Sequence, residues 1–187
     1  AGVQPEEVPR ILSAHRQAAR RAHRLLLIVV PADLNSELAA QIAAQGFSVA
    51  DWSLGELPDD GTQIMVADSP DDLGLWYRLA PLAFVGSSLI SGFGGRDPFA
   101  AAALGSAILY GPNVGDHLEA YSRLAAAGAA RIVKDADGLG TAVLRLIAPD
   151  LAASMAHSGW VVVSEGAALT DKVIDRVQAD LDEQQVI

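Results

Sequence analysis

One stretch of the sequence combines glycine, hydroxyl and cationic side chains in a way that suits anion binding. Residues 86–97 read Gly-Ser-Ser-Leu-Ile-Ser-Gly-Phe-Gly-Gly-Arg-Asp, between an apolar run and an alanine-rich segment. Glycine permits positive φ and lets a ligand approach backbone N–H groups closely, and a helix that follows would add its positive dipole end. The stretch therefore predicts a cradle for an anionic, nucleotide-type ligand. Its candidate site residues are Ser87, Ser88, Gly94, Gly95, Arg96 and Asp97.

The common phosphate-binding fingerprints do not fit this loop. Gly92, Gly94 and Asp97 break the dinucleotide pattern, and no Gly-Lys-Ser/Thr follows for a P-loop. The closing glycine of a nucleophile elbow is also missing. Ordinary kinase, dehydrogenase and hydrolase functions therefore lose support. One alternative stays open, a mobile surface loop in which Asp97 caps the following helix in place of a phosphate.

A second polar loop follows the next apolar run. Residues 111–116 read Gly-Pro-Asn-Val-Gly-Asp, and their candidate site residues are Pro112, Asn113 and Asp116. Asn and Asp side chains bond either a sugar or the local backbone, so turn formation alone also explains them. Residues 31–35 form a third candidate loop, for which helix capping is the favoured use.

The sequence predicts no metal site, no cofactor and no catalytic residue. It has no cysteine, and its histidines, His15, His23, His117 and His157, lack metal-ligand spacing with one another or with a carboxylate pair. His117 beside Asp116 has the chemistry of an acid or base, but a solvent-exposed histidine at a helix start is the simpler interpretation.

Alternating strands and helices are expected to position these loops. Short β-rich runs predict strands over residues 25–30, 47–52, 63–67, 82–86, 107–110 and 130–133. Helices are expected over 5–23, 35–45 and 69–79, from 97 onward, over 116–127 and through the C-terminus. Asp116 with Glu119 predicts an acidic capping box at the start of the helix over 116–127. This alternation predicts an α/β fold, a Rossmann-like doubly wound parallel sheet. Ligands of such sheets bind outside the carboxyl ends of the strands, where the candidate loops begin.

Bulk composition narrows the classes of function. The 187 residues are 51% hydrophobic and 5% aromatic, as one domain of helices on a parallel sheet requires. No apolar run approaches the roughly 20 residues that span a bilayer, so a soluble, cytoplasmic protein is expected. The net charge of −10 argues against nucleic acid as a partner. Arg16, Arg20 and Arg24 are spaced four residues apart and would form a basic row on one face of a helix. Exposure of this face to solvent is the simpler interpretation, and docking to a membrane surface or a partner is the alternative.

Three segments together resemble a known family. Leu82 to Leu89, Gly94 to Pro98 and Gly111 to Asn113 are similar, in order and spacing, to the C-terminal half of bacterial 3-deoxy-D-manno-octulosonic acid (Kdo) transferase. The resemblance runs over most of the chain, including Leu25 to Pro31 and Gly166 to Leu169. Members of this family are GT-B-fold glycosyltransferases. They transfer Kdo from CMP-Kdo to the lipid A precursor in lipopolysaccharide synthesis, without a metal.

The resemblance implies that residues 1–187 form a single donor-binding domain with C-terminal helices, one half of a GT-B fold. CMP-Kdo or a related sugar nucleotide is the expected ligand. In the family, an N-terminal half carries the acceptor site and the acidic catalytic base, and this half is missing here. The chain alone is therefore expected to be inactive. Contact with the lipid A precursor and with the cytoplasmic face of a Gram-negative inner membrane is expected only through that other half.

The candidate loop departs from the family pattern at several positions. The family's Gly-Gly-Ser is Gly86-Ser87-Ser88, and its Gly-Gly-His-Asn-Pro is Gly94-Gly95-Arg96-Asp97-Pro98 after one extra residue. The glutamate two positions beyond that proline is Ala100. A carboxylate that contacts the donor in the family is therefore absent.

Two other segments also depart from it. The Arg-His pair expected after Pro31 is Ala32-Asp33, and the Gly-Pro-His…Asn segment has Asn113 and Asp116. A carboxylate near a dianionic sugar nucleotide adds repulsion of about 1 kcal/mol or more per close pair in a partly buried site. Two further hypotheses stay open, a degenerate non-catalytic binding or scaffold module and a GT-B domain with another nucleotide-sugar donor.

Overall fold

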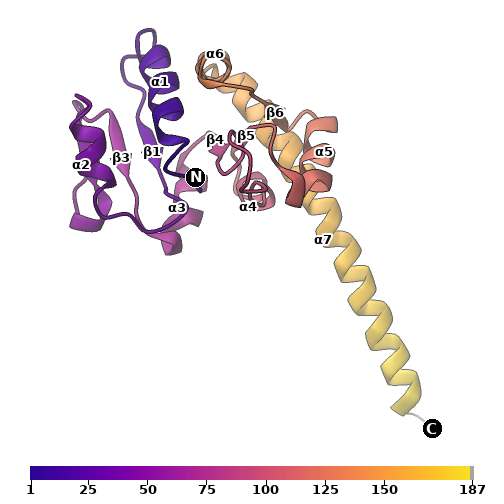
Figure 1. The fold of residues 1–187 in the computed structure, drawn as a ribbon. Helices are drawn as coiled ribbons and strands as arrows, with labels where there is room; N and C mark the ends of the chain where they lie inside the picture. The colour runs from indigo at the N-terminus through magenta and orange to yellow at the C-terminus, as the bar shows by residue number, and fades with distance from the viewer. Residues whose placement is uncertain (186–187) are drawn as a thin grey trace.

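Short parallel strands alternate with helices in the computed structural model, which describes residues 1–185 (Figure 1). One sheet has the spatial order β1 (Leu27–Val29), β3 (Ile64–Val66) and β2 (Val49–Asp51). The other has the order β4 (Leu82–Val85), β5 (Ala107–Tyr110) and β6 (Ala130–Ile132). All strand pairs are parallel. The predicted α/β fold is confirmed, and each of these strands lies within its predicted range.

The first residues of the chain lie between the two sheets. Val3 forms a parallel bridge with Pro31, and the Val3 N–H donates to the Val30 carbonyl at 3.1 Å. On the other side, the Gly86 N–H donates to the Ala1 carbonyl at 2.8 Å. The segment thus takes the place of a central strand between β1 and β4. The sequence pattern did not predict it, because so short a segment contains no apolar run.

Seven helices connect or cover the strands in the described part of the chain. They are α1 (Val8–Ala19), α2 (Leu38–Ala43), α3 (Leu73–Leu79), α4 (Phe99–Ala103), α5 (Leu118–Ala126), α6 (Ala136–Leu146) and α7 (Pro149–Gln185). Short 3₁₀ turns precede two of them, Pro70–Asp72 before α3 and Gly115–His117 before α5. Because α1 ends at Ala19, Arg24 lies beyond it, and the predicted basic row does not run along one helix. Arg24 instead forms an exposed ion pair with Asp60 at 3.4 Å.

Two apolar regions form most of the core. In the first, α1 and α6 pack closely, and a side chain on Gly140 of α6 would collide with Gln17 and the Ala14 carbonyl of α1. The second lies under β4 and β5 and contains Tyr77, Tyr110 and Tyr121. Tyr110 and Tyr121 have ring centroids 4.3 Å apart. The sequence has three tyrosines, and all of them pack in this region, Tyr110 as the last residue of β5.

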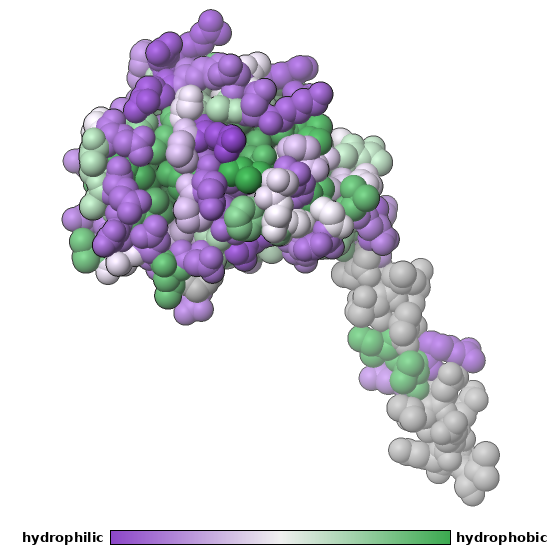
Figure 2. Space-filling view, in the orientation of Figure 1, coloured by the Kyte–Doolittle hydropathy of each residue, from purple (hydrophilic) through white to green (hydrophobic). Residues whose placement is uncertain are grey.

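The long helix α7 passes α5 and then runs away from the rest of the molecule (Figure 1). The side chains of Gly166 to Leu169, part of the sequence resemblance, lie outside the described residues. Among the described residues, no single helix is long and apolar enough to cross a membrane, and α6 with the first part of α7 reaches that standard only as a pair bent by 101°. The face in Figure 2 is mostly polar, with scattered apolar patches.

Candidate functional site

The loops after β4 and β5 are held together through Ser88. Its hydroxyl donates to the Val85 carbonyl at 2.6 Å and accepts the Gly111 N–H at 2.8 Å. Its carbonyl accepts the Asn113 N–H at 2.9 Å. Residues 86–89 are all buried, so the alternative of a surface loop is wrong for this part of the segment. The structure thereby brings the two predicted site segments together.

Glycine is required where these loops touch. A side chain on Gly111 would collide with the Ser88 backbone, and one on Gly94, at φ +71°, would collide with the Asp116 carboxylate. The predicted capping of α5 by Asp116 is wrong, because α5 begins at Leu118 after N-cap His117, without a side-chain cap. Asp116 is instead part of the contact between the two loops, and its N–H donates to the Gly94 carbonyl at 3.2 Å.

Ser87 has an unusual backbone conformation for a residue with a side chain. Its φ is +57°, and among the described residues it is the one non-glycine with positive φ. This conformation costs about 1 kcal/mol or more. The Ser87 hydroxyl donates to the Gly2 carbonyl at 3.0 Å and accepts from Gln4 Nε2 at 2.9 Å, and these hydrogen bonds offset part of that cost.

A buried carboxylate fills the backbone cradle that the sequence predicted for a ligand. Glu7 is fully buried, and its Oε2 accepts the Ser87 N–H at 2.7 Å and the Gln4 N–H at 3.0 Å. Its Oε1 accepts the Ser88 N–H at 2.9 Å and the Leu89 N–H at 2.8 Å. The expectation that these loop N–H groups face a ligand is therefore corrected, because Glu7 already occupies them.

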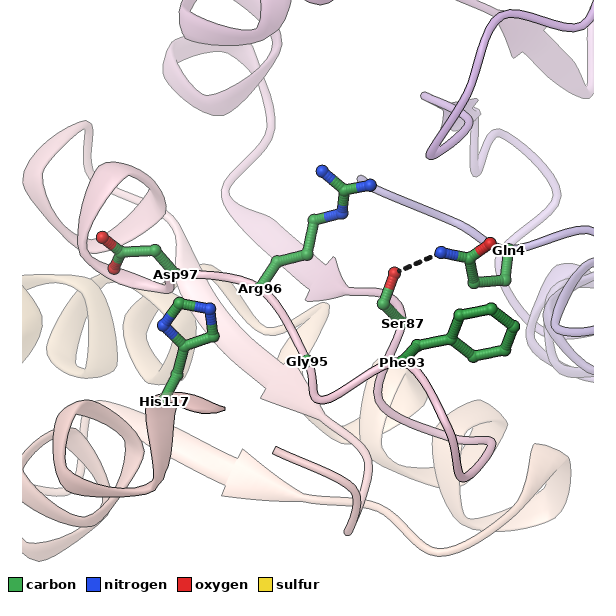
Figure 3. A pocket seen from close by; sticks show the side chains of 7 residues that line it. All are labelled: Gln4, Ser87, Phe93, Gly95, Arg96, Asp97 and His117. Atoms are coloured by element: carbon green, nitrogen blue, oxygen red, sulfur yellow. Dashed lines mark hydrogen bonds between the residues drawn. The ribbon is translucent and has the colours of Figure 1, made fainter. Parts of the chain in front are cut away.

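An open cavity of about 230 Å³ lies on the other side of the loop (Figure 3). Figure 3 places Gln4, Ser87 and Phe93 on one side, Asp97 and His117 on the other, and the Arg96 side chain between them. The predicted residues that line the cavity are Ser87, Gly95, Arg96 and Asp97. The remaining predicted residues, Ser88, Gly94, Pro112, Asn113 and Asp116, belong to the loops behind it and not to its wall.

Arg96 is the cation of this cavity. Its Nη2 donates to the Ala32 carbonyl at 3.2 Å, and its aliphatic part lies against Gly2, where any added side chain would collide with it. Its own carbonyl accepts the Tyr121 hydroxyl at 2.8 Å. A guanidinium has five N–H donors, and Arg96 is exposed, so donors remain for an anion in the cavity. Asp97 accepts the Phe99 N–H at 2.8 Å, but the N-cap of α4 is Pro98, without a side-chain cap, so Asp97 bonds the first residue of the helix without being its N-cap.

The tyrosines beneath the loop are kept in the neutral form. Burial raises the pKa of Tyr77 to about 12, with smaller opposing effects of Arg96, which lowers it, and Asp97, which raises it. Burial also raises the pKa of Tyr121, and Tyr77 and Asp97 add to that increase. The Tyr121 hydroxyl therefore remains a hydrogen-bond donor to the Arg96 carbonyl at neutral pH.

A second cavity, of about 190 Å³, lies beyond Ala32 at the ends of β1 and β3. Its lining residues are Val30, Pro31, Ala32, Asp33, Leu34, Asp68 and Ser69. Asn35 of the third candidate loop donates its N–H to Asp68 at 2.9 Å and accepts the Glu37 N–H at 3.2 Å. The Asn35 side chain therefore bonds the local backbone, but the predicted helix capping is wrong, because α2 begins at Leu38 after N-cap Glu37, without a side-chain cap.

Several residues of the site were not predicted as such from the sequence. Glu7 falls in the predicted helix over 5–23 and Gln4 just before it, Phe93 falls in the candidate loop, and Tyr121 falls in the predicted helix over 116–127. No sequence signal marks Glu7, because the strand that precedes it, at residues 1–3, has no local pattern of its own. Among the described residues, no group of three or more His, Cys, Asp or Glu side chains is placed to hold a metal ion.

Comparisons with known proteins confirm the resemblance to Kdo transferases. A curated 3-deoxy-D-manno-octulosonic acid transferase of Haemophilus influenzae is 27% identical over 176 residues, which cover 92% of this chain and 41% of that protein. Its counterpart in Bordetella pertussis is 30% identical over 171 residues, which cover 89% of this chain and 39% of that protein. The chain thus spans about two fifths of the length of these relatives. No family model matches the sequence.

A solved structure supports the fold. The crystal structure of the C-terminal CMP-Kdo binding domain of WaaA from Acinetobacter baumannii aligns with a TM-score of 0.77 at 24% identity. The alignment covers 87% of this chain and 86% of that domain. The Rossmann-like α/β architecture expected for one half of a GT-B fold is therefore confirmed.

Proposed function

We propose that this chain is the donor-binding domain of a Kdo transferase-like glycosyltransferase and binds CMP-Kdo in the cavity beside Arg96. The observation that carries the proposal is the position of Arg96. Its guanidinium stands in an open cavity at the carboxyl end of β4, between Ser87 and His117. The similarity to named Kdo transferases over most of the chain supports the same ligand class.

The chemistry of sugar transfer from a nucleotide donor suits such a cation. When the bond from the sugar to the phosphate oxygen breaks, the departing CMP phosphate gains negative charge. A fixed guanidinium stabilises that charge more in the transition state than in the bound donor. Arg96 therefore binds the donor phosphate and assists departure of CMP. In this proposal the base that activates the acceptor is supplied from outside these residues.

The contact between Arg96 and Ala32 would compensate for one departure from the family pattern, the missing arginine at position 32. The resemblance implies an arginine at position 32, where this sequence has alanine. The Arg96 guanidinium donates to the carbonyl of that same residue, so a cation stands beside position 32. We infer that Arg96 supplies from the β4 loop the charge that position 32 lacks.

The same proposal also concerns the acceptor site and the membrane contact of the glycosyltransferase. Because the chain spans about two fifths of the length of its relatives, we place the acceptor site in a region that these residues do not include. The proposed acceptor is the lipid A precursor. The proposed location of transfer is the cytoplasmic face of the inner membrane, which the other region would contact.

Calorimetric titration with CMP tests the proposal. The chain is expected to bind CMP with measurable heat, and the Arg96→Ala variant is expected to bind at least tenfold more weakly, since a charge-assisted contact is lost. UMP and GMP in the same experiment test the alternative of another nucleotide-sugar donor. A folded chain that gives no heat with millimolar CMP contradicts donor binding.

A second candidate function is a non-catalytic binding or scaffold module. Ala100 favours it, because this exposed position at the start of α4 lacks the carboxylate that the resemblance implies. Complementation in cells depleted of their own Kdo transferase separates the two functions. Growth with the unaltered full-length protein supports the enzyme, whereas growth only after Ala100→Glu supports a degenerate module.

A further inference from the structure

Glu7 is a fully buried acid whose four hydrogen bonds all come from backbone N–H groups. A carboxylate has two oxygens with about four acceptor positions, so the Ser87, Ser88, Leu89 and Gln4 donors match its full capacity. A buried charge without such partners is strongly disfavoured. Because donors and acceptors match in number, the loop satisfies the hydrogen-bonding capacity of the Glu7 carboxylate without any other partner.

The backbone at Ser87 explains why the donors converge. Left-handed residues among right-handed or extended ones turn successive N–H groups toward one side and form an anion-binding concavity. Ser87 has φ +57°, and the N–H groups of Ser87, Ser88 and Leu89 all point at Glu7. In glycine-rich phosphate loops the ligand itself fills such a concavity. Here a side chain of the protein fills it.

We propose that Glu7 is an internal anion that positions the donor-binding loop and directs the donor phosphate to Arg96 instead of to the loop N–H groups. The connection runs through Ser87, whose N–H donates to Glu7 and whose carbonyl accepts the Gly95 N–H at 2.9 Å. Gly95 precedes Arg96, so the carboxylate sets the turn from which the guanidinium projects. The part of this inference that concerns the donor rests on the proposed function.

Chemical rescue distinguishes this role from general packing. Glu7→Ala empties the concavity and leaves its N–H groups without acceptors, so the variant is expected to melt at a lower temperature and to bind CMP at least tenfold more weakly. Sodium formate is expected to refill the concavity, and relative to sodium chloride at equal ionic strength it should raise both the melting temperature and the CMP affinity of this variant. Glu6→Ala is the matched control, because Glu6 is the same residue type one position away and exposed. It should resemble the unaltered chain in both salts.

Glu7→Gln covers the case in which the alanine variant does not fold in either salt. The amide fills the same space but turns an NH₂ group toward N–H donors, so formate has no room to bind. We expect faster hydrogen exchange at the two N–H groups that face the NH₂ group, either Ser88 and Leu89 or Ser87 and Gln4, with exchange in α6 unchanged, and CMP affinity reduced at least tenfold.

Three results would overturn the proposal. They are a folded Glu7→Ala variant on which formate acts no more than chloride, a glutamine variant with unchanged exchange at all four donors (Gln4, Ser87, Ser88 and Leu89), and wild-type CMP affinity in either variant. The melting and exchange measurements need no nucleotide. If the unaltered chain fails to bind CMP while they give the expected results, the donor assignment is wrong and the positioning of the loop by Glu7 stands.

Discussion

The loops at the carboxyl ends of β4 and β5 differ from those at the ends of β1 and β3 in how they are anchored. Residues 86–89 are buried and bonded to Glu7 and to the 111–116 loop. The β1 and β3 loops meet through the Asn35 N–H bond to Asp68, and Leu34 there is 75% exposed. The first pair of loops therefore contains a buried, hydrogen-bonded segment at residues 86–89, whereas Leu34 in the second pair is open to solvent.

The charged side chains that line the two cavities also differ. The cavity at the β4–β5 loops is lined by Arg96 together with Asp97 and His117, whereas the lining of the cavity at the β1–β3 loops contains Asp33 and Asp68 but no lysine or arginine. A chain of net charge −10 repels anions at long range, so an anionic ligand needs local donors on a rigid frame. The buried loop residues and the cavity arginine thus belong to the same pair of loops, those that follow β4 and β5.

The largest effect is expected from Gly111→Ala. The added methyl group would collide with the Ser88 backbone, which is held in place by its N–H bond to Glu7, and we expect a loss of about 3 kcal/mol in the free energy of unfolding. Gly115→Ala in the same loop is the control, because no atom lies within 4 Å of the position of its added methyl. Urea unfolding measures both. Equal stabilities of the two variants would show that the loops are not closely packed.

Alkaline pH should weaken the half of the molecule that carries the site. The folded pKa of Tyr77 is about 12 against 10.0 for the free side chain, so its contribution is complete below pH 10 and is lost as the pH rises toward 12. We expect a decrease of about 2 to 3 kcal/mol in unfolding free energy over that range. Urea titrations at several pH values measure it, and Tyr77→Phe should flatten the dependence. An unchanged slope in that variant contradicts the assignment.

An arginine at position 32 should partly replace Arg96 in binding CMP. Arg96→Ala is expected to weaken CMP binding about tenfold or more, and adding Ala32→Arg should recover part of the loss, because the guanidinium rests on the Ala32 carbonyl. Calorimetry compares the single and double variants. Ala32→Arg alone is the control for an unspecific effect of added charge. No recovery in the double variant would mean that the site requires the guanidinium to come from the β4 loop.

Tyr121→Phe should have a smaller effect. It removes the hydroxyl that donates to the Arg96 carbonyl, at a cost of about 1 kcal/mol in stability and a few-fold in CMP affinity. Tyr110→Phe is the matched control, since no hydrogen bond of its hydroxyl occurs within the described residues. Thermal melting and calorimetry separate the two effects. If both variants bind CMP alike, the support that Tyr121 gives to Arg96 is unimportant.

Asp33→Asn should have the smallest effect. Its exposed carboxylate lines the cavity next to Ala32 and repels an anion across solvent, by about 0.5 kcal/mol. CMP binding is therefore expected to tighten about twofold at low ionic strength and not at high ionic strength. A large loss of affinity would instead place the ligand at the β1–β3 loops and reverse the comparison.

The sequence predicted the strands well because each is a compact apolar run between polar or glycine-rich segments. It failed at residues 1–3, where pairing with Pro31 and Gly86 makes a strand that no local pattern marks. The Asp116 capping prediction failed for a similar reason, because packing against Gly94 decides the role of that carboxylate. Local signals thus located elements better than they assigned side-chain roles.

The same limit applies to the site. Arg96 and Asp97 were found as cavity residues because loop composition alone pointed to them. Glu7 was missed, because an acid before a helix is common and only the folded chain brings it to the N–H groups of Ser87 and Ser88. The contact of Arg96 with Ala32 joins residues 64 positions apart, and no spacing rule predicts it.

The most direct test is an NMR titration of the isotope-labelled chain with CMP, read residue by residue. Donor binding beside Arg96 predicts amide shift changes concentrated at residues 93–97 and at His117, with Ser88 and Leu89 little affected because Glu7 occupies their N–H groups. Shift changes confined to residues 31–35 and 68–69, or none at millimolar CMP, would contradict the account.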